Sequence, residues 1–266
     1  QLFPVPNRSV VRSVAVGDSG RVYAGAYNEF GYLKTLESGK RVFHSLTDKI
    51  PQGYRDFGEV WEIFVTESGV IFQSFSAVYF YKDGTVKVLD YGKNYHFAFY
   101  LDQDLYITER DRGLLKYNGQ AFEKMPRGDF FSGDRKIWTM MQLSTGRFLI
   151  GTQNQGLFIY HGDTLKPWQC EANAFLKKHQ IFSATRISDN YFVFGSIQNG
   201  IILVNGEGEI LQHLNKERGL QNNTVLTTSC DQGGNLWLGL DNGIDYLEIQ
   251  SPISYLGEAY QIDGTG

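Results

Sequence analysis

The sequence has only two cysteines, Cys170 and Cys230, in 266 residues. Two thiols cannot supply a disulfide framework or a four-ligand zinc site. One bridge between them stays an alternative, and we interpret them as two small buried side chains. No apolar run approaches the roughly 18 residues of a membrane-spanning helix. The residues that follow Gln1 do not form a basic region and then an apolar stretch, as a signal peptide would. We therefore expect a mature or excised soluble piece of protein.

Basic charge and helical periodicity are also scarce. The net charge of −4 and the isoelectric point near 5.8 disfavour a general nucleic-acid binder or a polybasic membrane surface. Only Asn173–His179 reads as a short helical turn. Glycine, by contrast, is abundant, at about 11% against an average near 7%. Such a chain reverses direction often, and its many tyrosine and phenylalanine rings suit half-buried strands.

A motif recurs along the whole chain. In Asn235–Glu248 an apolar strand ends in a small residue, a polar tip follows, and a second apolar strand leaves it. The small residues that close the first strand of each copy are Gly25, Ser74, Thr108, Gly151, Gly195 and Gly239. Their spacings of 49, 34, 43, 44 and 44 residues match the period of about 40–50 residues expected for propeller blades.

The rest of each repeat supplies the other strands of a four-stranded sheet. Apolar runs upstream of the motif predict innermost strands at Val10–Val16, Val60–Val65, Ile137–Leu143, Ile181–Ile187 and Val225–Ser229. Tight turns such as Asp83-Gly84 and Asn118-Gly119 are strong hairpin signals.

These repeats predict an all-β fold, a β-propeller of four-stranded antiparallel blades, spanning residues 1–266. Ser251–Tyr260 is expected to form the last strand of the sixth blade, and Gln261–Gly266 to approach another. The array is therefore either six blades or part of a longer seven-bladed or two-lobed one. The six visible blades lie at about residues 7–50, 56–90, 94–125, 134–169, 179–214 and 222–260.

Two segments resemble a known repeat. Gly219–Glu248 (GLQNNTVLTTSCDQGGNLWLGLDNGIDYLE) resembles the two-component regulator propeller repeat, and Asn7–Leu33 is similar to a first copy of it. The resemblance implies a periplasmic input domain of a hybrid two-component system or a related triple-tyrosine transmembrane regulator. It further implies a ligand that is a glycan fragment, and a parent protein that carries any histidine kinase outside this chain. The second and third copies depart from the pattern, since Ser74 and Thr108 replace the glycine.

Motifs for catalysis are missing. The sequence has no G-x-S-x-G elbow, no Walker loop and no H-E-x-x-H, and its five histidines have no metal-ligand spacing. Ser229–Gly233 resembles the start of a sialidase Asp-box, but Trp237 arrives one residue late, and that box is itself a structural turn. We therefore predict no catalytic residue, no metal and no cofactor. A glycan-active enzyme, sialidase-like or lyase-like, stays the alternative, although the sequence alone does not show two carboxylates placed on either side of a glycosidic bond.

In a propeller, the loops between the second and third strands and the loops between blades emerge at the same end of the sheets. Their side chains mix amides, arginines and flat rings, the groups that bind the hydroxyls and ring faces of sugars. Asn-Gly and Gln-Gly tips are also what a tight turn demands. The candidate ligand-binding residues are Tyr54, Arg55, Trp61, Arg110, Arg112, Arg135, Trp138, Gln153, Asn154, Gln198, Asn199, Asn223, Asp241 and Asn242.

Three functions follow from these observations. The preferred one is a periplasmic, non-catalytic sensor that binds an oligosaccharide; the others are the glycan-active enzyme and a protein-docking scaffold. Expected partners are an adjacent propeller lobe or triple-tyrosine domain of the parent chain, which could form a homodimer. No nucleic-acid partner is expected, and contact with the membrane is expected only through other parts of the parent protein.

Overall fold

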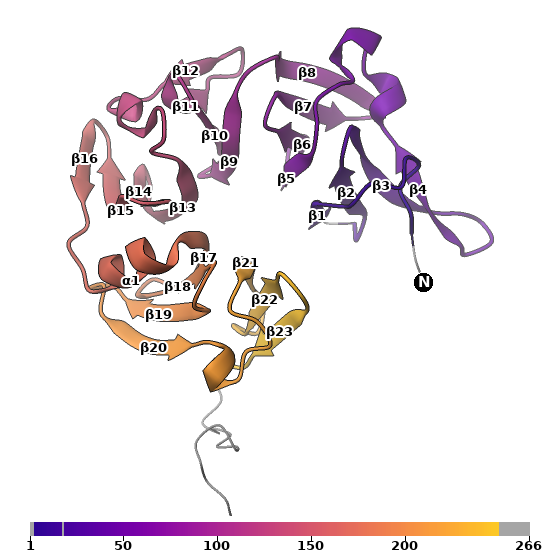
Figure 1. Ribbon diagram of the computed structural model, residues 1–266. Coiled ribbons are helices and arrows are strands. Elements are labelled where there is room, and N and C mark those ends of the chain that lie inside the picture. The colour runs from indigo at the N-terminus through magenta and orange to yellow at the C-terminus, as the bar shows by residue number, and fades with distance from the viewer. Residues whose placement is uncertain (1–2, 18, 250–266) are drawn as a thin grey trace, which may run out of the picture. The chain divides into compact units, whose positions relative to one another are not determined.

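The computed structural model describes residues 3–17 and 19–249 and is almost entirely β-sheet (Figure 1). The described residues form two compact units, divided between residues 136 and 137. The strand predicted at 251–260 and the further blade at 261–266 lie outside the described residues.

The first unit contains three four-stranded antiparallel sheets, in which the strands lie side by side in chain order. Its strands are β1 (Ser13–Val16), β2 (Val22–Ala26), β3 (Glu29–Thr35), β4 (Arg41–Ser45), β5 (Val60–Thr66), β6 (Gly69–Ser74), β7 (Ala77–Lys82), β8 (Thr85–Tyr91), β9 (Tyr95–Leu101), β10 (Asp104–Glu109), β11 (Gly113–Tyr117) and β12 (Phe122–Lys124). Three short 3-10 helices lie in its loops, η1 (Thr47–Lys49), η2 (Gln52–Tyr54) and η3 (Gly128–Phe131).

The second unit repeats this plan with two four-stranded sheets and one sheet of three described strands. Its elements are β13 (Ile137–Ser144), β14 (Arg147–Thr152), β15 (Gly156–His161), β16 (Thr164–Pro167), α1 (Ala172–His179), β17 (Ile181–Ser188), β18 (Tyr191–Ser196), β19 (Ile201–Asn205), β20 (Ile210–Leu214), η4 (Lys216–Arg218), β21 (Val225–Cys230), β22 (Leu236–Leu240) and β23 (Ile244–Leu247). The helix α1 lies against β15 and β18 and confirms the predicted helical turn (Figure 1).

The turns form where glycine and short polar residues were expected. Asp83 and Gly84 both have positive φ, 47° and 80°, and they join β7 to β8 as the Asp-Gly signal predicted. The first strand β1 begins at Ser13, three residues after the predicted start at Val10.

Consecutive sheets pack through their inner strands, β1 against β5 and β17 against β21. The Ser13 hydroxyl on β1 donates to the Val60 carbonyl on β5 at 2.8 Å. A Cβ at Gly25, which lies opposite Ser13, would come within 2.5 Å of the Val60 side chain. At Gly25 a small residue is therefore required, because the next blade approaches its backbone closely.

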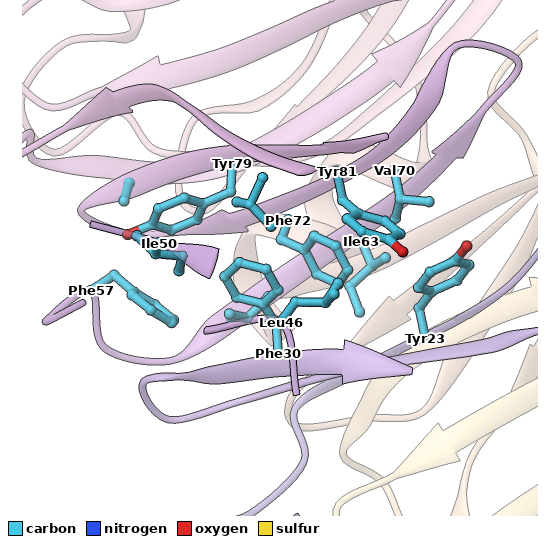
Figure 2. Packing of buried hydrophobic residues seen from close by; sticks show 13 residues of the cluster. Tyr23, Phe30, Leu46, Ile50, Phe57, Ile63, Val70, Phe72, Tyr79 and Tyr81 are labelled. Carbon is cyan, nitrogen blue, oxygen red and sulfur yellow. The ribbon is translucent and has the colours of Figure 1, made fainter. Parts of the chain in front are cut away.

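The core of the first two blades is aromatic. Phe30 and Phe72 stack with ring centroids 4.3 Å apart, and Tyr79 lies 5.2 Å from Phe30. Figure 2 shows these rings meeting between the two sheets, with Tyr23 at the far end of the cluster. Burial of these large rings therefore holds the first two blades against each other.

Strand pairing corrects one predicted residue in the repeat. In β6 the residue equivalent to Gly25, Gly151, Gly195 and Gly239 is Gln73, not Ser74, because Gln73 lies opposite Glu62 on the inner strand. The second blade thus has a glutamate and a glutamine where the first, fourth, fifth and sixth blades have a Ser/Thr–Gly pair.

Candidate functional site

Near the start of most inner strands a β-bulge turns one side chain out of the regular alternation. In β5 the pairing passes from Val60 opposite Ser74 to Glu62 opposite Gln73, which leaves Trp61 as the extra residue. Bulges re-aim side chains and are common beside binding sites. The same irregularity leaves the following residues as extra residues in β13, β17 and β21: Trp138, Phe182 and Leu226.

In the first unit this bulge helps to build a cluster of four rings, here called the ring cluster: Trp61, Phe75, His96 and Phe97. Phe75 stacks on Trp61, with centroids 5.1 Å apart and planes 12° apart. His96 stacks on Phe75 at 5.3 Å and 17°. Phe97 meets Trp61 edge-on at 6.0 Å. Phe97 is buried, whereas the other three rings are half-buried and keep some exposed surface.

A charged pair borders the ring cluster. Arg12 donates through Nε to the Glu59 carboxylate at 2.9 Å, and its guanidinium carbon lies 5.5 Å from the Trp61 ring centroid. Both charged side chains are partly exposed, 43% and 30%, so they can exchange this contact for a ligand. Flat rings beside a carboxylate and a guanidinium offer both a stacking surface and hydrogen-bond partners for hydroxyl groups.

Glu62 follows Trp61 on β5 and is half-buried. Desolvation raises the pKa of its carboxyl to about 8. A carboxyl that keeps its proton near neutral pH is unusual and marks the position as a candidate for function.

The second unit has its own ring pair and a polar network. Trp138 lies against Phe182, with centroids 4.4 Å apart. Asn199 donates through Nδ2 to His179 Nε2 at 3.3 Å and accepts at Oδ1 from Asn215 at 2.9 Å. Because an amide nitrogen only donates, His179 Nε2 is the acceptor and carries no proton. Burial, Lys178 and a nearby histidine lower the pKa of His179, in agreement with a neutral ring.

The structure places several predicted ligand residues in structural roles. Arg55 donates to the carbonyls of Ile50 and Asp48, and Arg112 to Glu109 and the Phe122 carbonyl. The Tyr54 ring meets Tyr91 edge-on at 5.1 Å.

In the second unit, Asn199 joins the network above, and the side-chain oxygen of Asn223 accepts from the Lys216 backbone.

Other predicted residues lie on exposed loops. The guanidinium carbon of Arg135 lies 4.6 Å from the centroid of the Phe130 ring, and Arg110 is exposed on the loop after β10. Of all the predicted residues, Trp61 alone joins the ring cluster. The tips of the second unit contribute the partly or fully exposed residues Gln153, Asn154, Gln198, Asp241 and Asn242.

Sequence reasoning missed Phe75, Glu62 and Gln73. Phe75 lies in the loop after β6, whereas the candidate residues at the other hairpin tips are polar or charged. Correct alignment of the second repeat on Gln73 would have marked both Glu62 and Gln73 as departures from the Ser/Thr–Gly pattern.

A groove of about 850 Å³ lies elsewhere in the first unit, and it contains none of the predicted residues. It is bordered by the turns at Ser68, Gln103 and Asn118, at the opposite end of the sheets from the ring cluster. Its lining includes the following aromatic and basic residues: Phe80, Tyr100, Tyr117, Lys87, Lys116 and Lys124.

Within residues 3–17 and 19–249, no three His, Cys, Asp or Glu side chains are close enough to hold a metal ion. Cys170 and Cys230 form no disulfide. None of the helices described here combines the length and hydropathy that a bilayer crossing requires.

No family model matches the sequence, and no curated protein matches it. Among solved structures, the WD40 β-propeller domain of Doa1 is 12% identical with a TM-score of 0.69, over 91% of this chain and 79% of that one. The extracellular domain of the one component system BT4673 from B. thetaiotaomicron is 18% identical with a TM-score of 0.68, over 94% of this chain. The chain spans about a third, 34%, of that extracellular domain.

A third similar structure is virginiamycin B lyase from Staphylococcus aureus, 15% identical with a TM-score of 0.69, over 94% of this chain and 88% of the lyase. At these identities the likeness concerns the fold. It confirms the predicted all-β propeller of antiparallel blades.

Proposed function

We propose that the chain is the extracytoplasmic, periplasmic ligand-sensing propeller of a bacterial two-component or related transmembrane regulator, and that its ligand is a glycan fragment. The observation that carries the proposal is the ring cluster with Arg12 and Glu59 at its border. A sugar ring stacks its C–H face on Trp61 while its hydroxyls replace the contact between the two charged groups. The similar extracellular domain of BT4673 supports the sensor role.

A panel of neutral and acidic oligosaccharides tests the proposal, with the melting temperature of the chain as the first readout. A ligand at a hundred times its Kd stabilises the folded state by about 2.7 kcal/mol, which raises the melting temperature by about 5–10 °C. The same incubations are analysed for shortened products. Stabilisation without turnover supports a sensor; cleavage contradicts it.

Variants then connect binding to the ring cluster. Trp61→Ala removes the stacking surface and is expected to weaken binding about tenfold, since a ring contact contributes up to roughly 1.5 kcal/mol. Trp237→Ala is the matched control, because Trp237 is 46% exposed and lies in the other unit. Equal loss in both variants would remove the ring cluster from the proposal. A panel that shifts no melting temperature would favour the protein-docking alternative.

A second candidate, a lyase-like enzyme acting on a glycan, is favoured by the neutral His179 held by Asn199. A neutral imidazole can accept a proton as a general base. Product formation that His179→Ala abolishes would establish this activity. Glu59, which borders the ring cluster, and Glu109 at the end of β10 are each paired with an arginine, which leaves both poorly placed for acid catalysis.

A further inference from the structure

The second blade differs from its neighbours at the contact between inner strands. In the first and fifth blades a serine hydroxyl donates to a carbonyl of the next inner strand, Ser13 to Val60 and Ser183 to Val225. Glu62 occupies the equivalent position in the second blade, with Gln73 opposite it in place of glycine. Residues opposite each other on antiparallel strands share a face, with Cβ atoms about 5 Å apart.

The orientation of the Gln73 amide follows from its partners. Its Nε2 donates to the carbonyl oxygens of Ser74 and His96, the latter at 2.9 Å. Both partners accept only, so the amide nitrogen must face them. Gln73 therefore takes over the link to the next inner strand, β9, which a serine provides elsewhere.

This orientation leaves Gln73 Oε1 buried without a donor. The residue is fully buried, and in the described part of the chain no group hydrogen-bonds to this oxygen. A buried acceptor without a donor costs about 1–3 kcal/mol. The side chain opposite is Glu62, and an ionised carboxylate there would place a second acceptor against the first.

We infer that Glu62 is held as a neutral carboxylic acid that donates its proton to Gln73 Oε1. The acid then satisfies the buried oxygen and fixes the amide that holds the His96 carbonyl. His96 stacks on Phe75 in the ring cluster. Glu62 is thus a positioning residue for the ring cluster, whichever ligand that cluster binds.

The surroundings offer no charge to keep Glu62 ionised. Arg12, which precedes β1, is paired with Glu59. Of the titratable groups on the elements packed against β5, Tyr95 donates to Asp90 and Tyr100 lies against Phe64. Tyr23 and His96 are the remaining two. Desolvation is the cause of the raised pKa of Glu62, about 8.

A folded-state pKa above the unfolded value means that folding takes up a proton between the two values. The stabilisation is complete below the unfolded pKa of about 4.5 and is lost as the pH rises through about 8. Glu62→Gln mimics the neutral acid and keeps a donor for Gln73 Oε1. Relative to this variant, the folding constant of the wild type is expected to fall by up to tenfold per pH unit from about pH 5 to 8.

Urea unfolding between pH 5 and 9 measures this difference, with Glu67→Gln on the exposed turn after β5 as the matched control. The free energy of unfolding of the control is expected to change with pH in parallel with that of the wild type. If the free energy of unfolding of Glu62→Gln also changed in parallel with the wild type, the inference would be overturned.

Two further measurements test directly the protonation of the Glu62 carboxyl and its effect on the ring cluster. An infrared difference spectrum of wild type minus Glu62→Gln at pH 7 is expected to show a protonated carboxyl band that vanishes near pH 8. Subtraction of the variant cancels the band of Glu29, whose pKa burial also raises.

Trp61 fluorescence, isolated by comparison with Trp61→Phe, is expected to change with the same midpoint. Glu62→Gln should keep the low-pH spectrum throughout, and Glu62→Ala should lose it at every pH. A wild-type spectrum without the carboxyl band would show that Glu62 is ionised. Trp61 fluorescence that does not change with pH would show that Glu62 plays no positioning role.

Discussion

The side-chain oxygen of Asn28 accepts hydrogen bonds from the backbone nitrogens of Phe57 and Gly58, at 2.8 and 2.6 Å. Asn28 is the hairpin tip of the first blade, and its partners lie on the loop that leads into the second. The tip, whose residue type also suits sugar binding, thus ties one blade to the next.

Substitution of Asn28 should therefore destabilise the first unit. Two partly buried backbone donors lose their acceptor in Asn28→Gly, at a cost of about 1–3 kcal/mol in the free energy of unfolding. Asn28→Ala should cost about 1 kcal/mol more, because φ at this position is +47°. Urea unfolding measures both. Asn242→Ala, at an exposed tip of the second unit, is the control, and an equal effect there would refute the role of Asn28.

Gly195→Ala tests the close approach of consecutive blades. A Cβ at this position would lie 2.4 Å from the Ser183 hydroxyl and 2.9 Å from the Val225 side chain. The strand and its neighbour must separate, at an expected cost of about 1–3 kcal/mol. Gly53→Ala, with open space around the new methyl group, should leave the unfolding midpoint unchanged. A neutral Gly195→Ala would mean that the fifth and sixth blades are loosely packed.

The fold was predictable because its signals are local. A blade is four short strands joined by tight turns, and a pair such as Asp83-Gly84 favours a hairpin turn whatever the distant residues are. The same pattern of strands and turns then recurs along the chain. Ser74 was predicted wrongly because the glycine-equivalent position of the second blade carries a long side chain, Gln73, and the nearest small residue in the sequence is its neighbour.

The ring cluster could not be predicted in the same way. Trp61, Phe75 and His96 come from an inner strand, a loop and the next inner strand, and their stacking depends on how two blades pack. Most predicted arginines and asparagines were chosen correctly as loop residues. Their partners, such as the Ile50 carbonyl that holds Arg55, depend on backbone paths that residue type does not reveal.

Arg186 offers a prediction that separates hydrogen bonding from charge. Its guanidinium donates to the Gln142 and Leu143 carbonyls of the preceding inner strand, at 2.7 and 3.2 Å, and to Asp189 at 2.7 Å. Arg186→Lys loses the forked geometry and should cost about 1.5–3 kcal/mol. Asp189→Asn should cost under about 0.5 kcal/mol, because Asp189 is fully exposed and such ion pairs contribute little. Chemical unfolding of both variants would contradict this account if the two effects were equal.

The turn at Asp231 should respond to acid through Trp237. Asp231 accepts from the Gly233 and Asn235 backbone nitrogens at 2.8 and 2.9 Å and from Trp237 Nε1 at 3.2 Å. The Asn235 backbone first, and then the other donors, hold the pKa of Asp231 below its usual value. Stability from this turn is therefore present above the unfolded pKa of about 3.8 and lost as the pH falls through the lower folded value.

Acid titration of tryptophan fluorescence, with Trp237→Phe to identify the signal, checks this expectation. The Trp237 emission is expected to shift below pH 3.8, when protonated Asp231 releases the turn. Asp231→Asn keeps one acceptor oxygen but cannot ionise, so its emission should not titrate in this range. If the variant titrated as the wild type does, another group would have to control the Trp237 environment. The resemblance of this segment to an Asp-box would then be a matter of sequence alone, without the carboxylate at its centre that the hydrogen bonds describe.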